Sequence, residues 1–174
     1  ELNLKWEPIL GFPLQIGVGL NTGPAQVGNA GSNLRMKYGP LGHAVNLASR
    51  IEGATKHFGV EILISDATQQ QLLDGFATRR LCRIRVVGIR GEVAVFELHA
   101  DGEDEWQTLC EQYENSLAAY EDGKLELAQE SLRTLLGDVR FHRDKASRVL
   151  LENVQTLLEQ PAAERSYVIE LSSK

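Results

Sequence analysis

Apolar and polar residues follow different periods in the two halves of the chain. Up to about His99, short apolar segments suited to strands alternate with segments of helical period. The first clear strand is LQIGVGLN, residues 14–21, which ends at turn residues 21–23. Interleaved strands and helices predict an α/β fold, in the form of an α+β sandwich with helices packed on a mixed or antiparallel sheet.

A helix is predicted from residue 44 to residue 58. Gly59 supplies its C-terminal end, and its apolar stripe comprises Leu47, Ile51, Ala54 and Phe58. The other predicted elements are two short strands at 25–32 and 35–42, a buried strand at 60–65, and an antiparallel strand pair at 76–87 and 92–99. A short helix is predicted at 66–75, capped by an aspartate or threonine.

From about residue 101 the apolar period is helical. Two helices broken at Gly123 and stopped at Gly137 predict a hairpin of roughly tetratricopeptide length. A third helix over 144–159 and a strand-like tail over 166–174 follow. We therefore predict two domains, 1–100 and 101–174. The second is either a packing appendage or a repeat that binds a protein partner.

Composition narrows the class of protein. The 174 residues are 43% hydrophobic and 24% charged, as in soluble globular proteins, and the net charge of −6 argues against nucleic acid or an anionic membrane as main partner. The separated Cys82 and Cys110 favour a reducing, cytoplasmic location over a disulfide or zinc site. No apolar run approaches the ~20 residues of a membrane helix. Because there is no initiator methionine, we expect a piece of a longer protein, whose membrane anchorage upstream stays open.

The glycines of GVGLNTGPAQVG fit phosphate-loop motifs poorly. Their spacing is G-x-G-x-x-x-G, whereas the dinucleotide-binding pattern is G-x-G-x-x-G opening directly into a helix. Gly17 and Gly19 instead share one face of the predicted strand. Small residues there allow another backbone or a ligand to approach closely.

Asn46 and Arg50 are the first candidate pair for chemistry. They lie in KYGPLGHAVNLASR, residues 37–50, where Gly39 and Pro40 predict a turn ahead of the helix. Four residues apart on a helix, the two side chains are neighbours and lie off the apolar stripe. A guanidinium beside an amide suits a polyphosphate or another oxyanion. A solvated helix flank explains the same spacing.

Arginines also gather on the predicted strand pair. The cluster comprises Arg79, Arg80, Arg83, Arg85 and Arg90, and the residues alternating with it, Cys82, Ile84 and Val86, give the strand an apolar face. The arginines form either a solvent-exposed basic face or an anion site. The four histidines have no metal-ligand spacing, and Ser49 has no evident histidine and acid partners, so neither a metal site nor a hydrolase triad is predicted.

Several of these motifs, in this order, resemble the second half of a class III adenylate/guanylate cyclase catalytic domain. IGVGLNTGPAQVGNAGSNLRMKYGPLGHAVNLASRIEGATK is similar to the family patterns G-I-x-x-G, VGNxGS and YxxxGxxVNxASR. RVVGIRGEVAVFEL is similar to the closing hairpin, VKGKxxPVxVYEL. The resemblance covers residues 14–98, and the helical tail resembles extensions after some bacterial cyclase domains. The resemblance to the catalytic domain implies a ferredoxin-like cyclase fold that lacks its N-terminal part.

The resemblance implies conversion of ATP to 3′,5′-cyclic AMP and pyrophosphate in signal transduction, at sites between two protomers of a homodimer. Asn46 would orient the ribose, and Arg50 would stabilise charge on the phosphate. Gly39 occupies the base-selecting position, usually Thr or Asp, and with Leu41 is expected to contact substrate. Arg90 is expected to replace the family's phosphate-binding lysine, whose position holds Val87.

The family's two metal-binding aspartates and its purine-reading lysine lie on upstream strands. Residues 1–13 contain no aspartate, so the ligands of Mg²⁺ or Mn²⁺ are expected outside this chain, and the chain alone is expected to be inactive. Two alternatives remain open. One is a degenerate, non-catalytic module that dimerises or senses nucleotide, and the other is a helical-repeat interaction module.

Overall fold

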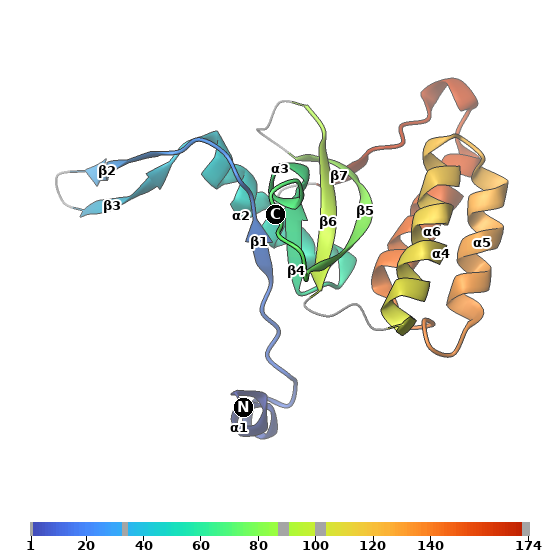
Figure 1. The fold of residues 1–174 in the computed structure, drawn as a ribbon, viewed down its shortest axis with the longest axis horizontal. Helices are drawn as coiled ribbons and strands as arrows, with labels where there is room; N and C mark the ends of the chain where they lie inside the picture. Colours follow the sequence, from blue (N-terminus) through green and yellow to red (C-terminus); the bar gives the residue numbers. More distant parts are fainter. Residues whose placement is uncertain (1, 33–34, 87–90, 100–103, 172–174) are drawn as a thin grey trace.

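A mixed five-stranded sheet forms the centre of the computed structural model, which describes residues 2–32, 35–86, 91–99 and 104–171 (Figure 1). Its strand order is β1-β4-β6-β5-β7, and β2 and β3 form a separate two-stranded ribbon. The strands are β1 (Val18–Leu20), β2 (Gln26–Ser32), β3 (Arg35–Leu41), β4 (Ile62–Ser65), β5 (Ala77–Val86), β6 (Val93–His99) and β7 (Ile169–Leu171). The helices are α1 (Leu2–Leu10), α2 (His43–Phe58), α3 (Asp66–Gln69), α4 (Asp104–Glu121), α5 (Leu125–Gly137) and α6 (Lys145–Glu159), with a 3₁₀ turn at Ala162–Glu164.

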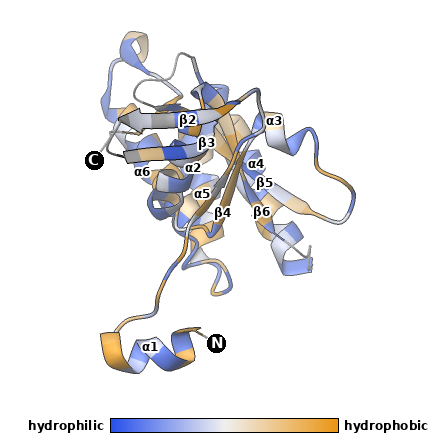
Figure 2. Cartoon of the chain, turned by 90° about the vertical axis from the view of Figure 1, so that its left-hand side faces the viewer, coloured by the Kyte–Doolittle hydropathy of each residue, from blue (hydrophilic) through white to orange (hydrophobic). Residues whose placement is uncertain are grey.

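The sheet confirms the predicted mixed α/β fold. β1 pairs with β4 in parallel, β6 pairs antiparallel with both β4 and β5, and β7 adds to β5 in parallel. Figure 2 shows hydrophobic residues along β4 and β6. The predicted antiparallel pair is therefore β5–β6, although its connection near 88–91 lies mostly outside the described residues.

Helix α2 is close to the prediction. Its buried residues include the full predicted stripe, and it ends at Gly59, whose φ of +71° is the left-handed conformation that glycine adopts without strain. The buried side chains are Leu47, Ile51, Ala54, Thr55 and Phe58. The helix contacts β1 and β4.

Four local predictions differ from the structure. The first strand spans only 18–20, and the unpredicted α1 precedes it and lies away from the sheet (Figure 1). The helix expected over 66–75 stops at Gln69, and Leu73, within the expected span, is exposed. Its N-cap is Ser65, rather than an aspartate or threonine. Gly39 and Pro40 form no turn, because they lie within β3 opposite Gly28 and Val27. A two-stranded ribbon has outer edges, where proline's missing N–H costs no ladder bond.

Helices α4, α5 and α6 follow the predicted helical period and pack on one another beside β5 (Figure 1). Gly123, with φ of +77°, separates α4 from α5, and Asp144 caps α6. Their buried residues form one cluster with those of the sheet. The tetratricopeptide likeness and the division at residue 100 stay predictions. No helix in the described ranges is long and apolar enough to span a bilayer.

Candidate functional site

Asn46 and Arg50 both lie on the solvent-facing side of α2, as their positions off the apolar stripe predict. The helix starts after Gly42, whose φ of +124° strongly favours glycine, and the backbone N–H of Asn46 donates to the Gly42 carbonyl at 3.1 Å. Both side chains are exposed, and neither has a hydrogen bond or ion pair to the described part of the chain. A guanidinium and an amide one turn apart are thus available to an external oxyanion.

The backbone of α2 lies almost directly on β1. A Cβ at Gly19 would be 2.2 Å from the Glu52 nitrogen and 2.5 Å from the Ala48 oxygen, and one at Gly17 would be 2.1 Å from Thr55 Oγ1. The two glycines therefore admit another backbone, one of the two options that the sequence left open. The close approach fixes how far Arg50 stands from the sheet.

We predict that Gly19→Ala displaces α2 and lowers the free energy of unfolding by about 1–3 kcal/mol or more, as overpacking usually does. The physical reason is that the new methyl group meets backbone atoms, which cannot rotate away. Denaturant titration of the purified chain measures the loss.

Gly53→Ala is the matched control for this substitution. Gly53 lies on the same helix, but a Cβ there has no neighbour within 4 Å. Alanine at this position should leave stability unchanged or raise it by roughly 0.5–1 kcal/mol. Equal stability of Gly19→Ala and the wild type would show that α2 does not rest on β1 in solution.

A small polar network holds the N-terminal end of α2. Asn21 Nδ2 donates to the Ala44 carbonyl at 3.0 Å, and the buried Ser65 hydroxyl donates to Asn21 Oδ1 at 2.7 Å. Thr22 and Thr68 share a hydrogen bond of 3.1 Å beside it. The sequence pattern indicated Asn21 and Thr22 only as turn residues. Their position directly after the Gly-x-Gly strand was the one available signal.

Two of the three predicted substrate contacts, Gly39 and Leu41, lie among the described residues. Gly39 lies on β3, where a Cβ would have no neighbour within 4 Å, so its backbone is open to approach. Leu41 is the partly exposed last residue of β3, separated from α2 by Gly42 alone. The chain order therefore brings Leu41 to the start of α2. Arg90 lies outside the described residues.

The predicted basic solvent face is wrong for Arg79, whose side chain is only 1% exposed. Arg79 pairs with Glu97 and Cys82 with Val95, and the register shifts between Arg80 and Cys82. One extra residue in a strand places positions three apart on the same face. The bulge therefore turns Arg79 toward the side of the sheet that buries Cys82.

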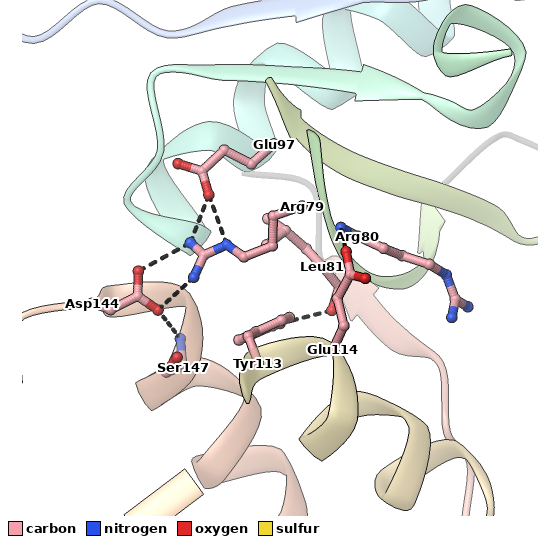
Figure 3. A network of polar contacts seen from close by, with 8 residues as sticks. All are labelled: Arg79, Arg80, Leu81, Glu97, Tyr113, Glu114, Asp144 and Ser147. Carbon is pink, nitrogen blue, oxygen red and sulfur yellow. Dashed lines mark hydrogen bonds and ion pairs between the residues drawn. The ribbon is translucent and has the colours of Figure 1, made fainter. Parts of the chain in front are cut away.

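Buried Arg79 is held by two carboxylates (Figure 3). Its Nε and Nη2 donate to Glu97 Oε2 at 3.0 and 2.6 Å, and Nη1 and Nη2 donate to the two oxygens of Asp144 at 3.0 Å each. The guanidinium also lies 5.2 Å from the Trp106 ring centroid and 4.8 Å from that of Tyr113. The cluster thus joins β5, β6, α4 and the start of α6.

The two carboxylates respond differently to this environment. Burial raises the pKa of Glu97 despite the charge of Arg79. Burial also opposes ionisation of Asp144, but the charge and hydrogen bonds of Arg79, together with the hydrogen bond from the Ser147 backbone N–H, hold the pKa of Asp144 below its usual value. Two acids share one cation, and the one with more hydrogen bonds to its charged form ionises more easily.

The other described arginines of this strand also have carboxylate partners. Arg80 donates to both oxygens of Glu121 at 2.8 and 2.6 Å, and Arg85 pairs with Glu92 and Glu170. Arg83 lies 3.9 Å from Glu92 and 3.7 Å from Glu121. Like Arg79, these three arginines therefore neutralise carboxylates of the fold.

Within the described ranges, no group of three or more His, Cys, Asp or Glu side chains could hold a metal ion. The described residues thus do not fit the Mg²⁺ or Mn²⁺ that the cyclase resemblance implies.

A family comparison matches residues 8–100 to the adenylate and guanylate cyclase catalytic domain. The chain is 37% identical over 109 residues to the terminal-differentiation specific adenylate cyclase of Dictyostelium discoideum, covering 59% of this chain and 5% of that protein. It is 33% identical over 94 residues to an adenylate cyclase of Anabaena cylindrica, covering 52% and 19%. An adenylate cyclase of Rhizobium meliloti is 35% identical over 80 residues, covering 46% and 12%. The chain thus spans between 5% and 19% of these relatives' lengths.

Among solved structures, two of a bacterial light-regulated adenylyl cyclase match about half of the chain. One has 24% identity and a TM-score of 0.42, covering 51% of this chain and 25% of that one. The other has 25% identity and a TM-score of 0.41, covering 52% and 26%. TM-scores this low do not by themselves establish a common fold.

Proposed function

Since this chain belongs to the adenylate and guanylate cyclase catalytic domain family, we propose that it is the C-terminal part of a class III cyclase domain within a longer protein. The proposed reaction converts ATP to 3′,5′-cyclic AMP and pyrophosphate for signalling in the cytoplasm. The curated relatives named above are all adenylate cyclases, which supports ATP as the substrate.

The observation that carries the proposal is the exposed Arg50, without a partner among the described residues, on a helix that packs closely on β1 and is held at its start by Asn21. In the proposed reaction the ribose 3′-oxygen attacks the α-phosphorus, the bond to the bridging oxygen breaks, and pyrophosphate leaves. Negative charge grows on the phosphate oxygens during this step, and the Arg50 guanidinium stabilises it. The Asn46 amide orients the ribose from one helical turn away.

Gly39 and Leu41 are proposed to contact the substrate on the approach to α2. Gly39 has no side chain with which to read a base, but the free space around it lets the base approach the β3 backbone. Leu41 offers an apolar surface beside Gly42. Arg90 is proposed to bind phosphate in place of the family's lysine.

Divalent metal ions serve the family in general, and the described residues of this chain do not fit them. We propose that carboxylates in a segment outside this chain bind the Mg²⁺ or Mn²⁺. The roles assigned to Asn46 and Arg50 do not depend on which metal that segment holds.

The β2–β3 ribbon is the proposed point of contact with a second protomer. It projects from the sheet (Figure 1), and Val27, Met36 and Tyr38 are 60%, 67% and 75% exposed. An isolated two-stranded ribbon is marginally stable in water, so packing against a partner would stabilise it. A second protomer of the cyclase family fits this requirement because the site is proposed to form between two copies.

We predict no formation of cyclic AMP by the purified 174-residue chain with ATP and Mn²⁺. The reason is the absence of a fitting metal site among its described residues, since the metal supplies much of the charge stabilisation in phosphoryl transfer. The assay is product detection by chromatography, with a longer protein that includes this chain as the positive reference. Turnover by the chain itself that Arg50→Ala abolishes would refute the placement of the metal ligands elsewhere.

Gly39 at the base-selecting position favours one alternative function, a non-catalytic module that binds nucleotide or dimerises. Its signature would be ATP binding by the longer protein without product. The third hypothesis, a helical-repeat interaction module, would gain support from a protein partner that binds residues on α4–α6 and leaves the cyclase-like part free.

A further inference from the structure

The start of α6 contacts the end of α2 directly. Lys145, the first residue of α6, donates from Nζ to the Lys56 carbonyl at 2.5 Å. Lys56 belongs to the last turn of α2, where backbone carbonyls lack partners within the helix. A cation at this end also interacts favourably with the helix dipole.

The stem of Lys145 covers the end of α2 as well. A Cβ at Gly59 would be 2.6 Å from Lys145 Cδ and 2.7 Å from its Cβ, so the lysine packs on the glycine that ends the helix. Burial, and then the charge of Lys145, lower the pKa of the neighbouring His57. Lys145 is therefore packed against α2 by its stem and bonded to it by its ammonium group.

Lys145 itself is anchored to the sheet through the preceding residue. Asp144 caps α6 by accepting from the Ser147 amide at 2.8 Å and binds the buried Arg79 of β5 with both oxygens (Figure 3). The neighbouring Lys145 therefore contacts α2 from a helix start that Asp144 ties to β5.

The α2–β1 contact leaves a role for such an anchor. Gly17 and Gly19 let the helix come close to the strand but offer no side chains that interlock with it. The buried stripe of α2 packs on the core, and the contacts at the helix ends, Asn21 on Ala44 and Lys145 on Lys56, add fixed points along β1.

We propose that Lys145 is a positioning residue for Asn46 and Arg50. Through this residue, α6 sets the placement of α2. This inference rests on the proposed cyclase function for its catalytic consequence. The physical contact with α2 can be tested without activity.

The first test is hydrogen exchange across α2 in the purified chain. Lys145→Met keeps the apolar stem over Gly59 and removes the ammonium donor. We expect amides of the last turns of α2 to exchange about tenfold faster, as loss of a charged hydrogen bond implies. Lys145→Arg retains a donor and should restore slow exchange. Lys124→Met, which removes an exposed lysine paired with Asp122, is the control and should change nothing in α2. Unchanged exchange in Lys145→Met would overturn the proposal.

The second test is a double-mutant cycle in the active longer protein. Lys145→Met should lower kcat about tenfold with little change in KM, since small misplacement of a catalytic group costs up to ~10²-fold. In an Arg50→Ala background the same substitution should have almost no further effect. Full additivity would overturn the positioning role, because Lys145 would then act independently of Arg50. If the unmodified longer protein makes no cyclic AMP, the proposed function fails, and the exchange experiment still decides the contact.

Discussion

Replacing Arg50 with alanine in the longer, active protein is expected to lower kcat by about 10²–10³ while KM for ATP changes little. The guanidinium meets negative charge that grows as the α-phosphorus is attacked, so its contact is stronger in the transition state than with bound ATP. Steady-state kinetics at saturating ATP measures both parameters.

Stability separates this role from a structural one. Arg50 is exposed and has no side-chain partner in the described part of the chain, so Arg50→Ala should change the free energy of unfolding by no more than about 0.5 kcal/mol. Arg133→Ala, at an exposed position of α5, is the matched control and should leave kcat unchanged. Normal turnover by Arg50→Ala would favour a solvated helix flank. Early melting would make Arg50 a structural residue.

Replacing buried Arg79 with methionine is expected to lower the free energy of unfolding by about 3–5 kcal/mol. The substitution leaves Glu97 and Asp144 close together without their cation and removes the ring contacts of the guanidinium. Urea titration of the purified chain measures the loss.

Arg83→Met is the control, because Arg83 lies on the same strand but is largely exposed and its ion pairs are long. Its loss should be no more than about 1 kcal/mol. Adding Glu97→Gln and Asp144→Asn to Arg79→Met should recover part of the stability, since no unpaired charge then remains. A loss below that of Arg83→Met would show that the buried cluster does not stabilise the fold.

Elements with a strong local period could be predicted from sequence. The stripe from Leu47 to Phe58 specified both the buried face of α2 and, by exclusion, the exposure of Asn46 and Arg50. Gly59 and Gly123 marked helix ends because a left-handed residue is required there. In each case the signal lies within a few residues of the feature.

Features that depend on distant contacts or on register could not be predicted. Strict alternation places Arg79 with Arg83 on the polar face, and only the bulge beside Leu81 reverses this. Lys145 binds a carbonyl 89 residues earlier in the chain, and no local pattern indicates such a contact. Gly39 and Leu41 were predicted as substrate contacts only from the family resemblance, because neither residue has a side chain with a polar or reactive group.

The edge of β5 has a consequence beyond the site. Near the bulge, Glu114 accepts from the Arg80 amide at 2.8 Å and Tyr113 donates to the Leu81 carbonyl at 2.7 Å (Figure 3). Further along, β7 pairs with residues 84–86 of the same strand. Helix α4 and β7 thus occupy backbone groups that would otherwise recruit a strand from another molecule. We therefore expect a protein trimmed to its cyclase-like part to expose these backbone groups of β5 and to self-associate through them.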